Sequence, residues 1–396
     1  MELSEAIQFD KGLVEVGDSS AIGRLFSRAK AGAELTIGFL GGSITQGAQA
    51  TDDTLCYAYR VFKWFEKSFP ESRFTYVNAG IGATDSEYAA ARVKEDLLDA
   101  HPDFVLMEFA VNDGCNEHFL EAYEGTLRQI LNSKPDIAVV LMCNVFYDEG
   151  KSAERIHRQV ARHYSIPMVS MRTTIYEAIL SGDIKNRQIT EDDLHPNDAG
   201  HRLVADVITT YLKSVAATCV CDKVQTREVF SGNCAQEAGS DAIAAEIVLP
   251  APLTANRYEH SIKFDNRNDS TVRRDMSGFM PDNTARTAVK DCFRYGYSAT
   301  TIGSFVEYEV EGACIAVQFR RTVNLPAPVA RLIVDGDESS AVILDANFDE
   351  TWGDMLVLTD VYMSERPAVH SVRIEIIEAH PDDKGDFYLA GIVVSG

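Results

Sequence analysis

The chain has 396 residues, of which 45% are hydrophobic and 24% charged, a composition typical of globular proteins with a sizeable core. Its 60 acidic and 37 basic residues give a formal net charge of −23, which argues against nucleic acid and anionic membrane surfaces as partners. The length suggests two or three domains.

Targeting and redox features of the sequence are few. No window approaches the roughly 18–20 apolar residues of a membrane span, and the first residues lack the basic start and apolar stretch of a signal peptide. We therefore expect a cytoplasmic protein. The eight cysteines are scattered and form no paired CxxC motifs, so we expect reduced thiols and no structural zinc.

The first half of the chain alternates between short apolar runs and longer amphipathic stretches. Apolar runs rich in β-branched residues, typical of strands buried on both faces of a parallel sheet, lie at 35–40, 74–80, 103–111, 137–145 and 166–170. Amphipathic segments that predict helices lie at 57–69, 86–100, 119–133 and about 197–217. This alternation predicts a doubly wound α/β layer.

After about residue 221 the chain changes to strands that alternate with period two. Val306, Tyr308 and Val310, for example, share one face of their strand. Strands are predicted at 242–249, 304–310, 313–319, 329–334, 371–377 and 387–394. Their alternation is typical of antiparallel sheets with one wet face and predicts a β-sandwich or jelly roll. We therefore expect an α/β domain over residues 1–220 and a β-sandwich domain over residues 221–396.

A serine among small residues follows the first predicted strand. The segment Gly41-Gly42-Ser43-Ile44-Thr45-Gln46-Gly47 begins where that strand ends, and sites in doubly wound sheets form at the carboxyl ends of strands. It is neither the GxSxG motif of the α/β-hydrolases, because Thr45 stands two residues after the serine, nor a phosphate-binding loop, because no GK[ST] follows. Ser43 is therefore a candidate nucleophile, and an ordinary loop is the alternative.

A candidate base for that serine lies about 150 residues further on. His195 follows Glu191-Asp192-Asp193-Leu194 and precedes a proline, just before the last predicted helix. An aspartate three residues upstream can fold back to hold the imidazole Nδ1–H, which leaves Nε2 free to take the serine proton. Asp193 is a second candidate for this carboxylate, but the spacing favours Asp192. A helix start with a surface histidine is the alternative.

Acyl transfer also needs donors for a developing oxyanion. The turn from Asn78 to Thr84 carries small residues that expose backbone N–H groups, and Asn112 offers a side-chain amide at the end of the run FVLMEFAV. Simple turn chemistry is the alternative for Asn112 and Asp113.

Together, these four blocks resemble the SGNH (GDSL-like) hydrolases, serine esterases built on a flavodoxin-like parallel sheet with helices on both faces. The resemblance covers roughly residues 34–215. It implies that Ser43 is the nucleophile, His195 the general base and Asp192 its orienting carboxylate. It also implies an oxyanion hole made by Asn112 and by backbone N–H groups of Ser43 and of Gly82 or Ala83.

The sequence departs from the family pattern at three points. The usual GDS around the nucleophile is Gly41-Gly42-Ser43 here, and the usual GxND is Ala110-Val111-Asn112-Asp113. Ala83 is in register with the glycine of the family's oxyanion hole, and Gly82 precedes it. A backbone donor requires no particular side chain, so an alanine at the position of this glycine does not threaten the predicted activity.

The second domain resembles the carbohydrate-binding modules attached to several deacetylating enzymes. Sandwiches bind sugars through exposed aromatic side chains flanked by polar ones. Trp352, in a polar segment, is the first candidate for substrate binding, followed by Tyr295 and Tyr297. A tryptophan packed at a domain interface is the alternative.

These features predict a serine esterase that removes O-acetyl groups from neutral acetylated carbohydrates, such as imported plant manno- or xylo-oligosaccharides. We expect no cofactor, no metal, and neither nucleic acid nor membrane as partner; a homo-oligomer stays open. The alternatives are a lysophospholipase or thioesterase of the same family, and a carbohydrate-binding protein without activity.

Overall fold

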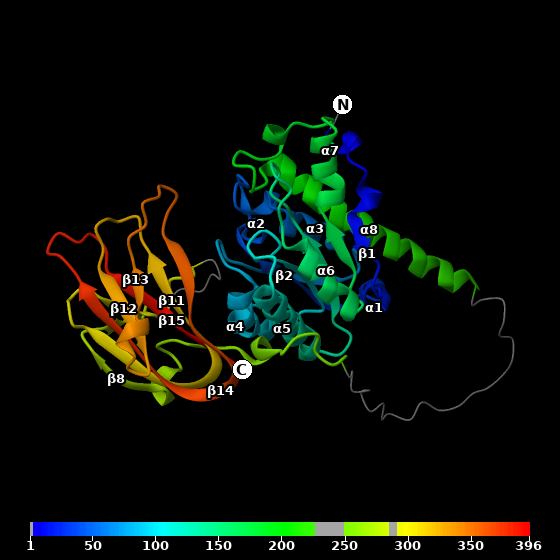
Figure 1. Cartoon of the computed structure of the whole chain (residues 1–396). Helices are drawn as coiled ribbons and strands as arrows, with labels where there is room; N and C mark the ends of the chain where they lie inside the picture. The colour runs from blue at the N-terminus through cyan, green and yellow to red at the C-terminus, as the bar shows by residue number, and fades with distance from the viewer. Residues whose placement is uncertain (1–2, 226–248, 285–290) are drawn as a thin grey trace, which may run out of the picture. The chain divides into compact units, whose positions relative to one another are not determined.

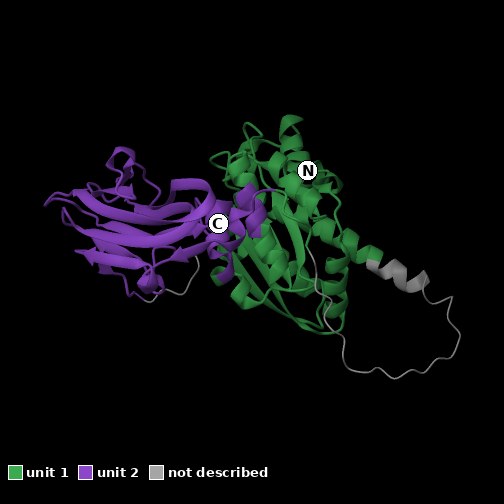
Figure 2. Cartoon of the chain, turned by 60° about the horizontal axis from the view of Figure 1, so that its bottom comes forward, with its two compact units in different colours: residues 1–80, 95–120, 127–253 green, residues 81–94, 121–126, 254–396 purple. Residues whose placement is uncertain are grey.

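The computed structural model describes residues 3–225, 249–284 and 291–396. Clustering of contacts divides the chain into two compact units (Figure 2), the first made of residues 1–80, 95–120 and 127–253 and the second of residues 81–94, 121–126 and 254–396. Most of the strand expected at 242–249 lies outside the described residues. Among the described residues, no helix combines the length and apolarity that a bilayer crossing requires.

The first unit, which carries the labels β1 and β2 in Figure 1, is built on a six-stranded sheet. The strand order is β1-β6-β5-β4-β2-β3. All neighbouring strands are parallel except β1, which pairs antiparallel with β6. The strands are β1 (Leu13–Glu15), β2 (Glu34–Gly41), β3 (Arg73–Gly80), β4 (Phe104–Glu108), β5 (Ala138–Cys143) and β6 (Met168–Ser170). The predicted doubly wound sheet is therefore confirmed, with β4 ending three residues earlier than its apolar run.

Helices cover both faces of this sheet, because right-handed crossovers place the helices of the two winding directions on opposite sides. The main helices of the first unit are α1 (Ser20–Lys30), α3 (Tyr57–Ser68), α6 (Glu154–His163), α8 (Asp198–Gln225) and the larger part of α5 (Glu117–Ser133). Helix α4 (Ser86–Asp96) belongs to the second unit as far as Lys94. Helix α8 contacts both α1 and α3. Beneath them lies an aromatic core in which Phe26 stacks on Phe69 at 5.1 Å and Phe65 meets Phe104 at 5.2 Å. Each fully buried phenylalanine stabilises the fold by roughly 1.5–3 kcal/mol.

The second unit contains an antiparallel nine-stranded sheet folded as a β-sandwich, as predicted. The strands are β7 (Ile262–Phe264), β8 (Arg273–Ser277), β9 (Met280–Pro281), β10 (Tyr297–Ala299), β11 (Phe305–Arg321), β12 (Val329–Val334), β13 (Val342–Asp345), β14 (Met355–Glu378) and β15 (Phe387–Ser395). Strand β11 pairs with β8 near its start, with β15 over residues 314–319 and with β14 along nearly its whole length. The two predicted strands 304–310 and 313–319 are thus one continuous strand.

The core of the second unit follows the predicted alternation. Val306, Tyr308 and Val310 are at most 2% exposed, and Phe319 stacks on Phe387 with ring centroids 5.7 Å apart. This unit also includes residues 81–94 and 121–126, where Ile81 and Tyr88 pack with Tyr388 and Ala390.

Candidate active site

Ser43 is the first residue of the short helix α2 (Ser43–Gln46), which follows the carboxyl end of β2. Gly47 ends this helix in the left-handed region, with φ of 107°. The N–H groups of Gly47 and Ala48 both donate to the Ser43 carbonyl, at 3.0 and 2.9 Å. A chain that turns this sharply after a buried strand holds the serine hydroxyl at the carboxyl edge of the sheet.

The end of β3 fixes the position of α2. At Gly80 a Cβ atom would lie 2.2 Å from the Gln46 backbone nitrogen, so only glycine permits this approach. The Asn78 side chain donates from Nδ2 to the Thr45 carbonyl at 2.8 Å and accepts from the Gly80 N–H at 2.9 Å. Strand β3 therefore contacts the helix that carries Ser43 through both packing and hydrogen bonds.

Ser43, His195 and Asp192 form a continuous hydrogen-bonded chain. The Ser43 Oγ lies 2.8 Å from His195 Nε2, and His195 Nδ1 lies 2.6 Å from Asp192 Oδ2. Burial raises the pKa of Asp192, but hydrogen bonds from the His195 side chain and from the backbone N–H groups of His195 and Leu194 outweigh it and hold the pKa below its ordinary value. A carboxylate at that position places the imidazole proton on Nδ1 and leaves Nε2 as the acceptor for the serine hydroxyl.

The loop that carries His195 is closed at its base. Thr190 and Pro196 form an isolated antiparallel bridge, and the Asn197 N–H donates to the Ile189 carbonyl at 2.8 Å. Asp193 binds the Arg187 guanidinium with both oxygens, each at 2.6 Å. Of the two adjacent aspartates, Asp192 is thus the one that contacts the imidazole.

Asn112 lies in the turn that follows β4, the strand next to β2. Gly41 of β2 is in register with Glu108 of β4, so Ser43 and Asn112 follow neighbouring strand ends. The N–H groups of Asn112 and Asp113 both donate to the Phe109 carbonyl, at 3.1 and 2.9 Å. This tight turn is why the predicted strand stops at Glu108.

Gly82 and Ala83 lie in the turn between β3 and α4, where Ala83 has a positive φ of 56°. This turn belongs to the second unit. The oxyanion role of these two residues stays a prediction.

One group that sequence reasoning did not single out is Glu108, a fully buried carboxyl at the end of β4. Burial raises its pKa to about 8, although it accepts the Ala110 N–H at 3.0 Å. It is therefore mainly protonated at neutral pH, beneath the turn that carries Asn112. The signal was a single acid inside the apolar run FVLMEFAV.

His201 is fully buried and is not part of the hydrogen-bonded chain of Ser43, His195 and Asp192. Its Nδ1 accepts the Tyr57 N–H at 3.2 Å, and its Nε2 donates to the Ala48 carbonyl at 3.1 Å. Burial lowers the pKa of His201 to about 4, so the ring is neutral at physiological pH. It joins the start of α3 to the segment that follows α2.

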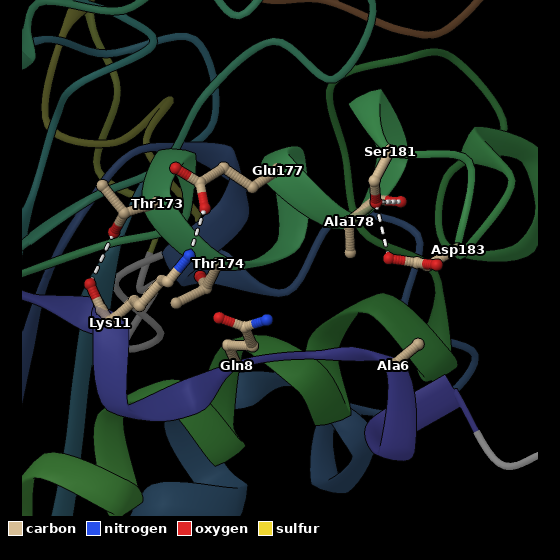
Figure 3. Close-up of a pocket in the computed structure, with 9 residues that line it drawn as sticks. All are labelled: Ala6, Gln8, Lys11, Thr173, Thr174, Glu177, Ala178, Ser181 and Asp183. Carbon is tan, nitrogen blue, oxygen red and sulfur yellow. Dashed lines mark hydrogen bonds and ion pairs between the residues drawn. The ribbon is translucent and has the colours of Figure 1, made fainter.

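A separate hollow of about 170 Å³ lies beside the N-terminal turns of the first unit (Figure 3). Lys11 pairs with Glu177 there at 3.3 Å, and the Ser181 hydroxyl donates to Asp183 at 2.6 Å. None of the nine described residues that line it is a histidine. It therefore has a serine next to a carboxylate but lacks the base that acyl transfer requires.

In the second unit Trp352 is 60% exposed and meets the Phe348 ring edge to face at 5.1 Å. The Arg321 guanidinium lies 4.9 Å from the Phe348 ring centroid, and Asp354 accepts from the Thr322 hydroxyl at 2.8 Å. The segment that presents Trp352 is thus anchored at both ends.

The prediction for Tyr297 as a sugar-binding residue is wrong. This side chain is 1% exposed and its hydroxyl donates to Asp269 at 2.8 Å. Its position on the inner face of the sandwich explains the error, because an aromatic residue in a turn-rich segment can equally be a core residue. One face of the Tyr295 ring is covered by the Arg267 guanidinium at 4.0 Å.

Comparisons with known proteins agree with this geometry. Residues 39–203 match the model of the GDSL-like Lipase/Acylhydrolase family. Over 98% of its length the chain is similar to a two-domain esterase (CEX) active on acetylated mannans, with 45% identity and a TM-score of 0.88, covering 99% of that protein. The chain belongs to the GDSL-like (SGNH) hydrolase family. It is a carboxylic ester hydrolase.

Curated relatives of this GDSL-like hydrolase match less than half of the chain. The acetylxylan esterase of Geobacillus stearothermophilus is 24% identical in an alignment 196 residues long, which covers 42% of this chain and 89% of the relative. The thioesterase 1/protease 1/lysophospholipase L1 of Escherichia coli is 26% identical over 193 residues, 46% of this chain and 86% of the relative.

Proposed function

We propose that this hydrolase removes O-acetyl groups from acetylated oligosaccharides, with Ser43 as nucleophile, His195 as general base and Asp192 as the carboxylate that orients His195. The observation that carries this proposal is the chain of short hydrogen bonds from Ser43 Oγ through the imidazole to Asp192. A free serine hydroxyl is a weak nucleophile, and this arrangement supplies both the base and the group that holds it.

In the proposed reaction the Ser43 Oγ attacks the acetyl carbonyl carbon while His195 Nε2 takes the hydroxyl proton. The negative charge on the carbonyl oxygen is stabilised by the Asn112 amide and by backbone N–H groups, among which we expect those of Ser43 and of Gly82 or Ala83. The imidazolium then gives its proton to the departing sugar oxygen. Water, activated by His195, hydrolyses the acetyl-serine and releases acetate.

Two features support a carbohydrate as the acyl carrier. The similarity to the mannan-active esterase extends through both units at 45% identity, and the net charge of −23 repels an anionic substrate. Acetylated manno- and xylo-oligosaccharides are therefore the proposed substrates. The exposed Trp352, with Phe348 behind it, supports a sugar-binding role for the sandwich.

The test compares acetate release from acetylated manno- and xylo-oligosaccharides with hydrolysis of 4-nitrophenyl acetate and 4-nitrophenyl palmitate. We expect wild type to hydrolyse the acetates and Ser43→Ala to lose at least about 10³-fold in kcat. Ser181→Ala, which removes the serine paired with Asp183, is the matched control and should keep full activity. A preference for palmitate would favour a lysophospholipase or thioesterase, and full activity of Ser43→Ala would disprove the assigned nucleophile.

A further inference from the structure

Asp113, the residue next to Asn112, is paired with a buried histidine. Its Oδ2 lies 2.8 Å from Nε2 of His157, and both side chains are completely buried. His157 belongs to α6, 44 residues further along the chain. A carboxylate in this environment is stabilised only when donors satisfy it.

The other ring nitrogen of His157 faces a thiol. Cys143, the last residue of β5, has its Sγ 3.8 Å from His157 Nδ1. Burial, and then the nearby carboxylate of Glu154, raise the pKa of Cys143 well above its ordinary value, so it keeps its proton. A protonated thiol donates to Nδ1, which places the imidazole proton on Nε2, where it is donated to Asp113.

A cysteine, a histidine and an aspartate in sequence could resemble a second catalytic centre. Nucleophilic catalysis, however, needs an accessible thiolate. Cys143 and His157 are both 0% exposed and the thiol is protonated. The three residues therefore have a structural role, which can be inferred from the part of the fold that they contact.

The three residues lie next to the turn that carries Asn112. Helix α6 and the residue before it contact this turn at two points: the N–H of the N-cap residue Ala153 donates to the Ala110 carbonyl at 2.7 Å, and His157 contacts Asp113. Asn112 lies between these two attachment points. The backbone of the turn that carries the Asn112 side chain therefore cannot shift without breaking a buried hydrogen bond.

We infer that Cys143, His157 and Asp113 form a positioning chain that holds the Asn112 amide where the oxyanion develops. This inference rests on the proposed function of Asn112 as an oxyanion donor. The three are positioning residues and not catalytic residues, because they act through Asn112. A small displacement of a donor from the oxyanion lowers the rate of the chemical step and leaves ground-state binding unchanged.

The experiment measures kcat and KM of the full chain on 4-nitrophenyl acetate. We expect His157→Leu to lower kcat by about 10- to 100-fold with KM nearly unchanged. His157→Gln, which keeps an amide donor for Asp113, should recover most of this loss. Cys143→Ser, whose hydroxyl also donates to Nδ1, should stay near wild type.

A double-substitution cycle separates positioning from general damage. In an Asn112→Ala background, His157→Leu should cost less than about 3-fold, because the group on which it acts is gone. An undiminished loss in that background, or wild-type kcat for His157→Leu alone, would overturn the inference. The Ser43→Ala assay tests the proposed function separately, since its outcome does not depend on His157.

A measurement on the wild type needs no variant to fold. Nitrogen-15 NMR of the histidine side chains should show His157 as a neutral ring protonated at Nε2 at pH 7. A ring protonated at Nδ1, or a charged imidazolium, would contradict the chain of donors from Cys143 to Asp113.

Discussion

At the scale of single residues, the two histidines of the catalytic edge have opposite environments. His195 has a carboxylate partner and a side chain that is 22% exposed. His201 is buried between two backbone groups and has no carboxylate among the hydrogen bonds described above. Burial thus keeps the His201 imidazole neutral at physiological pH, whereas the His195 imidazole contacts both a carboxylate and the Ser43 hydroxyl. The two histidines are only six residues apart in sequence, so their different roles follow from their different positions in the fold.

The buried His201 predicts a loss of stability in acid. Its pKa is about 4 in the folded protein and 6.5 in an unfolded chain. The unfolded state therefore binds a proton that the folded state does not, and stability falls as the pH drops from 6.5 to 4. Between pH 7 and 4.5 the loss from this residue is on the order of 2 kcal/mol.

His201→Gln, which can accept from Tyr57 and donate to Ala48, is the matched variant. Urea titrations at pH 7 and 4.5 should show that wild type loses more free energy of unfolding than the variant does. Equal pH dependence in the two proteins would mean that His201 is protonated in the folded state.

The polar residues of the site were predictable where they interrupt an apolar pattern. Ser43 and Asn112 follow predicted strands and Asp192-His195 precedes a predicted helix, which made them candidates, and the family resemblance then combined them into one site. The pairing of Asp113 with His157 was not predictable, because it joins residues 44 apart and His157 looks like any histidine on an amphipathic helix. Only the packing of α6 against the Asn112 turn reveals it.

At the scale of elements, the position of α2 depends on two strand ends. Gly80 leaves no room for a Cβ beside the Gln46 backbone, and a Cβ at Gly41 would lie 2.1 Å from the Thr45 Oγ1. Because α2 begins with Ser43, any shift of this helix moves the nucleophile.

Gly80→Ala should therefore lower kcat on 4-nitrophenyl acetate by at least about 10-fold, since a displacement near 1 Å can cost as much as 100-fold. Gly182→Ala is the control, because its Cβ would meet nothing within 4 Å and only its positive φ of 80° opposes the change. Full activity of Gly80→Ala would show that β3 does not set the position of α2.

The elements of the first unit were predicted more accurately than those of the second. Strands buried on both faces form continuous apolar runs in the sequence. The observed ends of β2, β3, β5 and β6 lie within two residues of the ends of the runs that predicted them. In the sandwich the bulge between Gly312 and Cys314 interrupts the alternation, so β11 looked like two strands. The first half of β14 was missed because most of its side chains are at least partly exposed.

At the scale of the whole molecule, the sandwich presents an aromatic side chain that its own core does not use. Trp352→Ala should raise KM on acetylated manno-oligosaccharides by about 5-fold or more, in line with the 1–3 kcal/mol range of a single good contact, and should leave 4-nitrophenyl acetate unaffected. Ile343→Ala, also exposed on the sandwich at 57%, is the control. Equal losses on both substrates would indicate folding damage and contradict a binding role.

The expected cytoplasmic location and the boundary at residue 220 stay predictions. The predicted boundary falls inside α8, which continues to Gln225.

The second unit is assembled from distant segments of the chain, and this has a consequence for how the two halves of the protein evolve. Ile81 and Tyr88 pack into one apolar cluster with Leu356 and Tyr388, while Ala90 and Ala122 pack into another with Tyr258 and Ala313. These contacts join residues 81–122 of the chain to residues that follow position 253. A recombination event near residue 220 would separate the partners of both clusters and leave each fragment with a solvent-exposed apolar surface. We therefore expect the two halves of this esterase to be inherited together and not to be exchanged independently by recombination.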